Sequence, residues 1–574
     1  MVDASVKDKS IEKREELTET GGYISKLVLN NANEIHVNEN DIVVFVGPNN
    51  AGKSQALKDI YELCETKKPT VVVKDIEIVK HGGKITELLD RIATVGDLGF
   101  YKSYTVLGHK FTNSSIIDYE SDKYYGAVRP VFVAYLNTLN RLTICNPAPL
   151  IARKAARSHP IHYAAFDRKY REWLGENFKK AFGKELIPHI LNGENIPLCI
   201  GDAVKFEKNF IDEQVRQEEY ADVLDTYKQV QDQGDGIKSF TGILLYLMLD
   251  HYCTFLIDEP ESFLHPPQAN IMGRIIGEIL KEKQQVFIST HSEEIIKGLL
   301  DVCPERVKII RITRRDDINE FYCLENARFS QIWNDPLLKY SNIMTSLFHK
   351  DVVLCESDSD CKLYSIIENH IKQSEGKYSE TLFIHCSGKH RMAKIVTALR
   401  ALNINVKLVP DIDVINDKTV FKGIIEAFGI EWTTIESDYN NIVSNLHSSK
   451  EKIDRNNAKA IIEEVLEGKT SQFLSGKELK EIRSAISTVS KWDDIKKAGV
   501  AALPAGNATI SYKNMEKVLE ATGIYIVPVG ELECFVKEVG GHGPEWVNSV
   551  LEIYPDLDDS VYDEIKKFIR RVCL

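Results

Sequence analysis

The feature that most constrains the fold is a phosphate-binding loop near the N-terminus. The sequence Gly-Pro-Asn-Asn-Ala-Gly-Lys-Ser at 47–54 follows the apolar run Ile42–Val46 and opens a helical pattern at 55–65. This is the G-x-x-x-x-G-K-[ST] motif in its strand–loop–helix setting. The two glycines let backbone N–H groups curve around a phosphate, and the helix N-terminus adds partial positive charge. The sequence therefore predicts an α/β domain that binds a nucleoside triphosphate.

The residues of this loop have distinct expected roles. Lys53 reaches the β- and γ-phosphates of ATP, and Ser54 holds Mg²⁺. The other loop residues that we expect to contact ATP are Gly47, Asn49, Asn50 and Gly52.

Two later strands are expected to complete the nucleotide site. The apolar run Tyr252–Ile257 ends at Asp258 and Glu259. In such a site Asp258 holds Mg²⁺ through water, and Glu259 orients or deprotonates the attacking water. The next apolar run, Gln285–Ser289, is followed by His291, which is placed to sense the γ-phosphate. We therefore count Asp258, Glu259 and His291 among the ATP-binding residues.

Composition limits the class of protein. A chain of 574 residues exceeds a single core and predicts three or four units. No apolar run approaches the roughly 20 residues of a membrane span, and the first residues lack a signal-peptide core. Eleven scattered cysteines without a C-x-x-C motif indicate reduced thiols in a cytoplasmic protein. Because the net charge is −13, DNA binding requires a local basic surface.

A basic segment lies within a predicted helical arm at about 145–232. Residues 151–184 hold nine Lys or Arg residues against three carboxylates, a net charge of +6. The aromatic residues that recur there at helical spacing are Tyr163, Phe166, Tyr170 and Trp173. The segment could contact DNA, with cations on phosphates and rings on bases. Alternatively, the rings pack against a neighbouring element and the basic face is solvated. The pattern favours packing for the rings and leaves both interpretations open for the basic face.

The second half predicts a parallel sheet with carboxylates at one edge. Strand Asp351–Cys355 ends at Glu356, strand Thr381–His385 precedes a turn at Gly388, and strand Val406–Val409 ends before Asp411 and Asp413. This β-α-β-α-β order implies parallel strands with right-handed crossovers. Because the carboxyl ends of parallel strands lie at one edge, we expect Glu356, Asp411 and Asp413 to converge.

Such a group of carboxylates predicts a divalent-metal site. Clustered carboxylates repel one another unless a cation binds, and their oxygens suit Mg²⁺ or Mn²⁺. Two such ions can activate a water and stabilise the leaving oxygen in phosphodiester hydrolysis. The metal ligands expected across the chain are Glu356, Asp360, Asp411, Asp413, Ser54 and Asp258.

Further candidates follow a predicted strand at Gly523–Val529. Glu531 or Glu533 could supply a ligand for a second metal, and the sequence does not choose between them. The nearby candidates for phosphate contact or acid catalysis are Lys513, Lys517, Lys537 and His542. For any one of these four, a solvated surface charge is the more common role.

The first half resembles the ABC-type ATPase heads shared by SMC- and RecF-like proteins. The resemblance rests on Gly47–Ser54, on Asp258-Glu259-Pro260 and on His291. The segment Gln233–Ser239 is similar to the signature loop of that family, although the usual Leu-Ser-Gly-Gly core is absent. The resemblance implies that Gly234 and Gly236 of one subunit contact ATP held by another. It thus implies a homo-oligomer that forms through the ATPase half.

The second half resembles the TOPRIM domain through Glu356, Gly388 and the pair Asp411 and Asp413, with Ser357 where that family often has Gly. An ABC head followed by TOPRIM is similar to the OLD (overcoming lysogenization defect) family of ATP-dependent endonucleases. The implied fold is α/β. A P-loop ATPase domain at 1–345 carries a helical dimerisation arm at about 145–232. A Rossmann-like TOPRIM domain at 346–574 carries a helical insertion at about 418–505.

The OLD resemblance implies a Mg²⁺- or Mn²⁺-dependent, ATP-regulated endonuclease that nicks or cuts duplex DNA in bacterial antiphage defence. Its implied partners are DNA and either a helicase, as in Gabija systems, or a reverse transcriptase with its DNA product, as in retrons. The residues expected to be catalytic are Glu356, Asp411, Asp413, Glu531 and Glu533.

Two alternatives are weaker. A non-catalytic ATP-gated DNA clamp or sensor of the SMC/RecF type, acting in DNA repair, would not need clustered carboxylates. Primase- or topoisomerase-like chemistry is disfavoured because the sequence shows no identifiable tyrosine nucleophile and no zinc-ribbon cysteines.

Overall fold

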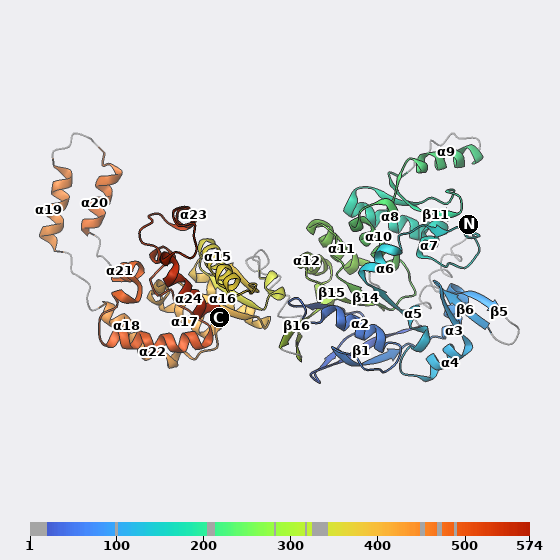
Figure 1. The fold of residues 1–574 in the computed structure, drawn as a ribbon, viewed down its shortest axis with the longest axis horizontal. Coiled ribbons are helices and arrows are strands. Elements are labelled where there is room, and N and C mark those ends of the chain that lie inside the picture. The colour runs from blue at the N-terminus through green and yellow to red at the C-terminus, as the bar shows by residue number, and fades with distance from the viewer. Residues whose placement is uncertain are drawn as a thin grey trace, which may run out of the picture. The chain divides into compact units, whose positions relative to one another are not determined.

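The computed structural model divides into two compact units, 1–339 and 340–574 (Figure 1). It describes residues 20–97, 102–203, 213–279, 283–315, 318–323, 343–447, 454–467, 473–486 and 491–573.

A six-stranded sheet forms the centre of the first unit. Its strand order is β17-β16-β3-β15-β14-β8, and only the edge strand β17 runs antiparallel. The strands are β3 (Ile42–Val46), β8 (Val133–Leu136), β14 (Thr254–Asp258), β15 (Gln285–Ser289), β16 (Val307–Arg315) and β17 (Ile318–Cys323). Every residue of β3 and β15 is buried, as expected for apolar strands covered on both faces. The sheet confirms the predicted α/β class.

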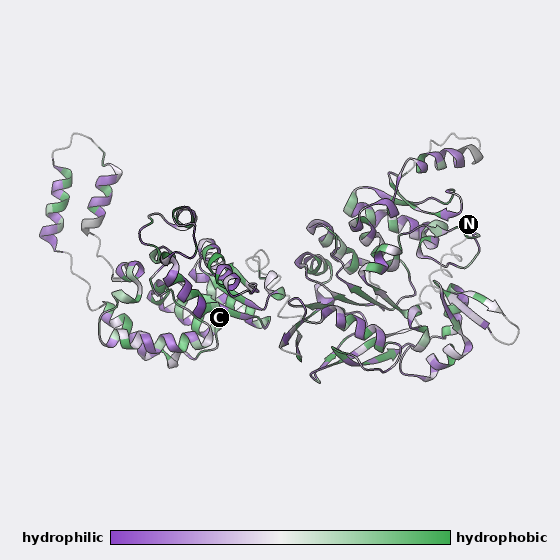
Figure 2. Cartoon of the chain, in the orientation of Figure 1, coloured by the Kyte–Doolittle hydropathy of each residue, from purple (hydrophilic) through white to green (hydrophobic). Residues whose placement is uncertain are grey.

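Helices cover both faces of this sheet (Figure 1). The helix α2 (Lys53–Leu63) lies on one face, and α11 (Pro266–Ile279) and α12 (Glu293–Val302) lie on the other. The helix α10 (Asp235–Leu247) precedes β14 and packs on the short α6 (Thr138–Thr143). Hydrophobic residues concentrate on the central strands, whereas the outer helices alternate in hydropathy (Figure 2).

Two smaller antiparallel sheets lie beside this core. The first has the order β2-β1-β4, and the second is the meander β5-β6-β7. Their strands are β1 (Gly22–Leu29), β2 (Glu34–His36), β4 (Val73–Lys80), β5 (Thr94–Asp97), β6 (Lys102–Val106) and β7 (His109–Thr112). The accompanying helices are α3 (Ile85–Ile92), α4 (Asn113–Ser121) and α5 (Arg129–Phe132).

The segment at 145–232 is mixed rather than wholly helical. Its helices are α7 (Pro160–Phe166), α8 (Arg168–Phe182) and α9 (Glu213–Asp225). Its strands are β9 (Ala148–Pro149), β10 (Glu185–Pro188), β11 (Asn195–Ile196), β12 (Leu198–Gly201) and β13 (Lys228–Gln229). The stretch at 185–201 is apolar and interrupted by Pro and Gly, which favours short strands and turns over a helix.

The basic residues of this segment are largely engaged in ion pairs. The pairs are Arg168–Glu172, Lys169–Asp250, Lys179–Glu185, Lys180–Glu278 and Lys184–Asp202, with N–O distances of 2.6–3.4 Å. Among the rings, Tyr163 and Tyr170 pack edge to face at 5.6 Å. These contacts favour packing over a continuous DNA-binding face on α8.

A small parallel sheet, ordered β19-β18-β20, forms the centre of the second unit. Its strands are β18 (Asp351–Cys355), β19 (Thr381–His385) and β20 (Asn405–Val409), joined by α15 (Asp358–Ser374) and α16 (Met392–Ala401). The predicted strand at 523–529 is reduced to one parallel bridge, Leu408 to Ile524. Pairing stops early because Pro528 lacks an N–H and the chain turns at Gly530, where φ is 111°.

The remaining elements of the second unit are helical. The segment at 418–505 contains α17 (Lys418–Ala427), α18 (Glu436–His447), α19 (Arg455–Leu466), α20 (Gly476–Ile486) and α21 (Lys491–Ala498). The chain then forms α22 (Asn507–Thr522), α23 (Gly543–Ile553) and α24 (Asp563–Cys573). In the described residues, no helix combines the length and apolar character that a membrane span requires.

Acid should destabilise the first unit through His251, which precedes β14. Burial lowers the pKa of His251 to about 4, although Asp250 opposes the shift. Below pH 6.5 the unfolded chain binds a proton that the native state refuses, so stability falls until about pH 4, by up to about 3 kcal/mol. Above pH 6.5 this histidine has no effect. We expect urea midpoints of His251→Phe to fall less over this window than wild-type midpoints.

The exposed His36 on β2 provides the control, since His36→Gln should keep the wild-type pH dependence. Parallel losses of stability in wild type and His251→Phe would contradict this prediction.

Candidate functional site

The phosphate-binding loop has the backbone conformation that its glycines predict. Gly47 has φ 141°, and a Cβ there would lie 2.0 Å from the carbonyl oxygen of Ile312 on β16. Gly52 caps α2 in the left-handed region with φ 99°, and Asn50 also has positive φ, 59°. Asn49, Asn50 and Ser54 are exposed. The loop therefore presents its polar groups to solvent at the start of α2.

Lys53 lies inside this loop. Its Nζ donates to the carbonyl oxygens of Gly47 at 2.9 Å and Pro48 at 2.8 Å. Burial lowers the pKa of Lys53 to about 8, against the attraction of Glu259, Glu261 and Asp258. The charges of Asp258 and Glu259, the two residues predicted from the later strand, therefore act on Lys53.

Residues without a recognisable motif anchor the loop and the helix α2 that follows it. Asn319 of β17 donates to the carbonyl of Ala51 at 2.6 Å and accepts from Asn30 at 2.8 Å. The carboxylate of Asp59 on α2 accepts the N–H groups of Val72 at 2.6 Å and Val73 at 3.1 Å. Sequence reasoning missed these residues because their partners are distant in the chain and follow no fixed spacing.

The ends of β14 and β15 bring the predicted Asp258, Glu259 and His291 together. The Ser289 hydroxyl donates to Asp258, and the Glu259 N–H donates to the Ser289 carbonyl at 2.9 Å. The His291 ring lies 3.9 Å from a Glu259 oxygen. Burial, followed by the charge of Lys53, lowers the pKa of His291, so its ring is neutral at pH 7.

Glu261 and Arg141 hold the backbone that carries Asp258, Glu259 and His291. The buried carboxylate of Glu261 accepts the backbone N–H of His291 at 2.7 Å. Arg141 of α6 has no exposed surface, and its guanidinium donates to the carbonyls of Asp258 and of Glu259, the latter at 3.1 Å. Glu259 has positive φ, 47°, which costs free energy in a residue other than glycine. We infer that Arg141 holds the backbone in this conformation.

The two glycines of the predicted signature segment lie at the start of α10. Gly234 caps the helix, and a Cβ on Gly236 would lie 2.5 Å from the carbonyl oxygen of Phe263. Gly236 therefore packs on the loop that follows Glu261. Contact of either glycine with ATP in a second subunit stays a prediction.

The second unit brings its predicted carboxylates to one edge of the sheet. Glu356 follows β18, and Asp411 and Asp413 follow β20. The N–H of Ile412 donates to the Gly530 carbonyl at 3.0 Å, which links this segment to the loop of Glu531 and Glu533. Gly530 in turn packs on α21, since a Cβ there would lie 2.0 Å from the Lys496 carbonyl oxygen.

The carboxylates are close enough to perturb one another. Burial and the charge of Asp413 raise the pKa of Glu356. Burial, Asp360 and Glu356 raise the pKa of Asp411 well above its ordinary value. Glu356 Oε2 and Asp413 Oδ1 are buried without a hydrogen-bond partner. Unsatisfied carboxylate oxygens at this density fit a divalent cation such as Mg²⁺ or Mn²⁺.

Two lysines face this acidic centre, and neither was assigned a role from sequence. Lys389, in the turn after Gly388, lies 3.1 Å from Asp413, and Lys496 of α21 lies 3.2 Å from Glu531. Burial lowers the pKa of Lys496, but attraction to Glu531 and Asp413 outweighs it and the net pKa is raised. The predicted candidates Lys513, Lys517 and Lys537 are instead exposed. Only the three-dimensional position of α21 reveals Lys496.

The other predicted ligands have additional bonds. Asp360 accepts the Ser357 N–H at 2.8 Å in a capping box at the start of α15, and burial raises its pKa. Glu533 accepts the Gly543 N–H at 2.8 Å and lies 2.6 Å from His542 Nδ1. In the described part of the chain, the potential ligand atoms of Glu531, Glu533 and His542 lie within 4.8 Å of one another. Both glutamates, rather than one, therefore lie in this region.

Comparisons with known proteins agree with these features. Residues 148–297 match the AAA domain family described as a putative AbiEii toxin of a type IV toxin–antitoxin system. The Old nuclease of Escherichia phage P2 is 22% identical over 327 residues, which cover 55% of this chain and 49% of that protein. The chain thus spans about half the length of this curated relative. The matches confirm the resemblance to OLD nucleases with an ATPase domain.

Solved structures of SMC heads also match. An SMC head bound to the C-winged helix domain of ScpA is 16% identical, with a TM-score of 0.34 and coverage of 54% of this chain and 99% of that chain. The SMC head domain from Thermotoga maritima is 13% identical, with a TM-score of 0.29 and coverage of 53% and 99%.

Removing the guanidinium of Arg141 should destabilise the first unit. Arg141→Met removes the guanidinium donors to the Asp258 and Glu259 carbonyls, of which the Glu259 carbonyl keeps the Ser262 N–H at 3.0 Å. We expect the free energy of unfolding to fall by about 3 kcal/mol. Arg168→Met, at an exposed position on α8, should change it by less than about 0.5 kcal/mol. Urea unfolding measures both. Equal stability of the two variants would show that Arg141 does not support the loop.

Proposed function

We propose that this protein is an ATP-regulated, divalent-metal-dependent DNA endonuclease. The observation that carries the proposal is the acidic centre, where burial and neighbouring charge raise the pKa of Glu356 and Asp411. Glu356 Oε2 and Asp413 Oδ1 are buried there without a hydrogen-bond partner. Buried carboxylates that repel one another are costly unless they bind a cation. The similarity to the Old nuclease supports hydrolysis of DNA as the reaction.

The carboxylates would hold Mg²⁺ or Mn²⁺, with Glu356, Asp411 and Asp413 as the main ligands and Asp360, Glu531 and Glu533 around them. The ions would supply an activated water and charge stabilisation at the leaving oxygen. Lys389 orients Asp413 through its 3.1 Å contact. Lys496 is protonated beside Glu531 and Asp413, and its positive charge would attract and stabilise the negative charge of a DNA phosphate.

The first unit would bind ATP and regulate cleavage. Lys53 would leave the Gly47 and Pro48 carbonyls for the phosphates, while Ser54 and Asp258 would hold Mg²⁺. Glu259 would orient the attacking water, and neutral His291 would contact the γ-phosphate. Gly234 and Gly236 of a second subunit would close the site, so we propose a homo-oligomer formed through this unit.

The biological setting follows from the same family resemblance. We propose that the nuclease acts on duplex DNA in bacterial antiphage defence. A helicase, as in Gabija systems, or a reverse transcriptase with its DNA product, as in retrons, would be the partner.

Substitution of Glu356 tests the acidic centre. With plasmid DNA and Mg²⁺ or Mn²⁺, Glu356→Gln should reduce the cleavage rate by at least about a hundredfold, because a ligand is lost. The same variant should raise stability in the absence of metal, since repulsion among the carboxylates is relieved.

The matched control is Asp358→Asn, an exposed carboxylate two residues away that pairs with Lys362 at 2.8 Å. It should cleave like wild type. Equal cleavage by wild type and Glu356→Gln would refute the assignment of the acidic centre. Absence of cleavage by wild type, with either metal and with or without ATP, would favour the DNA clamp.

Substitution of Lys53 tests regulation. Lys53→Ala should abolish ATP binding because it removes the contact to the phosphates, and it should make cleavage insensitive to ATP. Metal-dependent cleavage itself should persist. ATP binding by calorimetry and plasmid cleavage with and without ATP measure the two effects.

Lys58→Ala, at an exposed position on the same helix, should behave like wild type in both assays. If folded and correctly assembled Lys53→Ala lost all metal-dependent cleavage, ATP would be required for the reaction rather than regulating it.

A further inference from the structure

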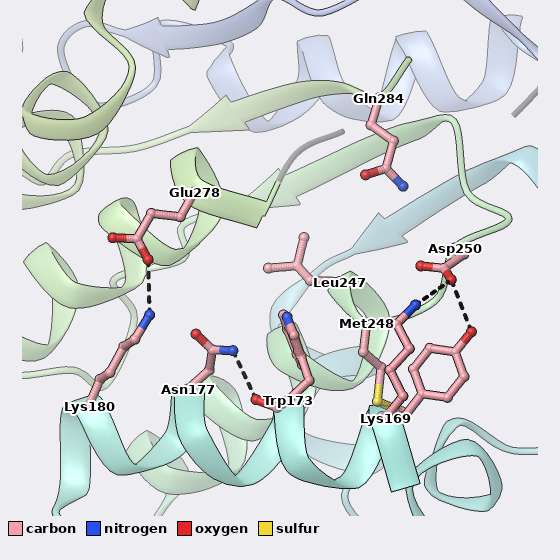
Figure 3. A pocket seen from close by; sticks show the side chains of 10 residues that line it. Lys169, Trp173, Asn177, Lys180, Leu247, Met248, Asp250, Glu278 and Gln284 are labelled. Carbon is pink, nitrogen blue, oxygen red and sulfur yellow. Dashed lines mark hydrogen bonds and ion pairs between the residues drawn. The ribbon is translucent and has the colours of Figure 1, made fainter. Parts of the chain in front are cut away.

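A cavity of about 350 Å³ lies in the first unit beside α8 (Figure 3). Its wall includes Asp250, which precedes β14, and Gln284, which precedes β15. The phosphate-binding loop and His291 instead follow the carboxyl ends of β3 and β15. Because these strands are parallel, the cavity lies at the opposite edge of the sheet from the nucleotide site.

The charged groups around the cavity are paired with one another. Lys169 and the Tyr170 hydroxyl contact Asp250 at 3.4 and 3.1 Å, and Lys180 contacts Glu278 at 2.9 Å (Figure 3). The two cations balance the two carboxylates, so the cavity carries no net charge. A phosphate group would have to displace a carboxylate from its lysine, which makes this a poor anion site.

One side of the cavity is lined by an aromatic ring and two apolar side chains. The Trp173 indole rises from α8 into the space, and Leu247 and Met248 approach it from the end of α10 (Figure 3). Aromatic and thioether groups of this kind bind the face of a flat ring. The volume is within the range of small-ligand pockets, about 300–1,000 Å³.

The Asn177 amide is directed into this space. Asn177 is 6% exposed, and its amide nitrogen donates to the Trp173 carbonyl at 2.9 Å. This bond fixes the amide so that Oδ1 points into the cavity (Figure 3). Among the described residues, Oδ1 has no hydrogen-bond donor. The cavity therefore offers a stacking surface and an oriented acceptor, beside charged groups that are paired with one another.

We propose that this cavity binds a nucleobase, stacked on Trp173, whose exocyclic amino group donates to Asn177 Oδ1. Nucleobases combine a flat π-face with edge donors, and stacking on an aromatic side chain contributes strongly to their binding. Adenine, guanine and cytosine carry the amino group, and thymine does not. The ligand is either a free nucleoside or nucleotide, or an unpaired base of a DNA strand. The proposal does not depend on nuclease activity.

Titration of the full-length protein with nucleosides tests this proposal. Nucleosides lack the phosphates that the loop at 47–54 would hold, so the nucleotide site does not compete. We expect adenosine and cytidine to quench tryptophan fluorescence saturably, with thymidine about tenfold weaker because Asn177 Oδ1 would lack its donor. Binding should depend little on salt, in contrast to phosphate binding.

Variants of the two residues separate stacking from hydrogen bonding. Trp173→Leu should weaken cytidine binding about ten- to a hundredfold, measured by calorimetry, whereas Trp173→Phe retains a ring and most of the binding. Asn177→Leu should remove the preference for cytidine over thymidine. Arg168→Gln, exposed on the same helix, is the control and should bind like wild type.

The source of the base is distinguished in the Lys53→Ala background. Adenosine monophosphate is compared with a single-stranded oligonucleotide that has one cytosine and with the same strand made abasic there. Oligonucleotide binding that requires both the base and Trp173 assigns the cavity to DNA, and binding of the monophosphate alone assigns it to free nucleotides. Absence of saturable quenching, or unchanged binding by Trp173→Leu, would overturn the proposal.

Discussion

Repulsion between buried carboxylates dominates the second unit. The parallel strands β18 and β20 bring Glu356, Asp411 and Asp413 to one edge, where burial and neighbouring charge raise the pKa of Glu356 and Asp411. Lys389 and Lys496 counter this repulsion, since each lies within 3.2 Å of a carboxylate. The two lysines offset this repulsion in part, and a bound divalent cation would relieve it further. The site is therefore expected to favour cation binding.

The nucleotide site in the first unit also places a cationic side chain beside its acidic residues. There a buried cation lies beneath the acidic loop, since Arg141 donates to the carbonyls of Asp258 and Glu259. In both units the strands supply the acidic residues, and an element outside those strands supplies the cation. The acidic residues are therefore positioned by regular sheet geometry, whereas the cations depend on how helices and loops pack on it.

This difference explains how much could be predicted from sequence. Strands β15, β18 and β19 were predicted with the observed bounds because each is a short apolar run followed by polar residues. The edge position of Glu356 follows from the same rule. Lys496 and Arg141 could not be found this way, since their partners lie far along the chain. The strands within 145–232 were missed because charge at helical spacing outweighed short apolar runs.

The position of Lys496 also changes how the insertion at 418–505 should be regarded. Its last helix, α21, carries Lys496, and Gly530 packs directly on the backbone of that helix. A shortened protein that joined α18 to α22 would keep the three strands and every predicted carboxylate, yet it would lose both a charge at the site and the surface that supports the Glu531 loop. The smallest fragment that retains the complete acidic centre therefore includes the segment at 418–505, because α21 contributes both a charge and a supporting surface to it.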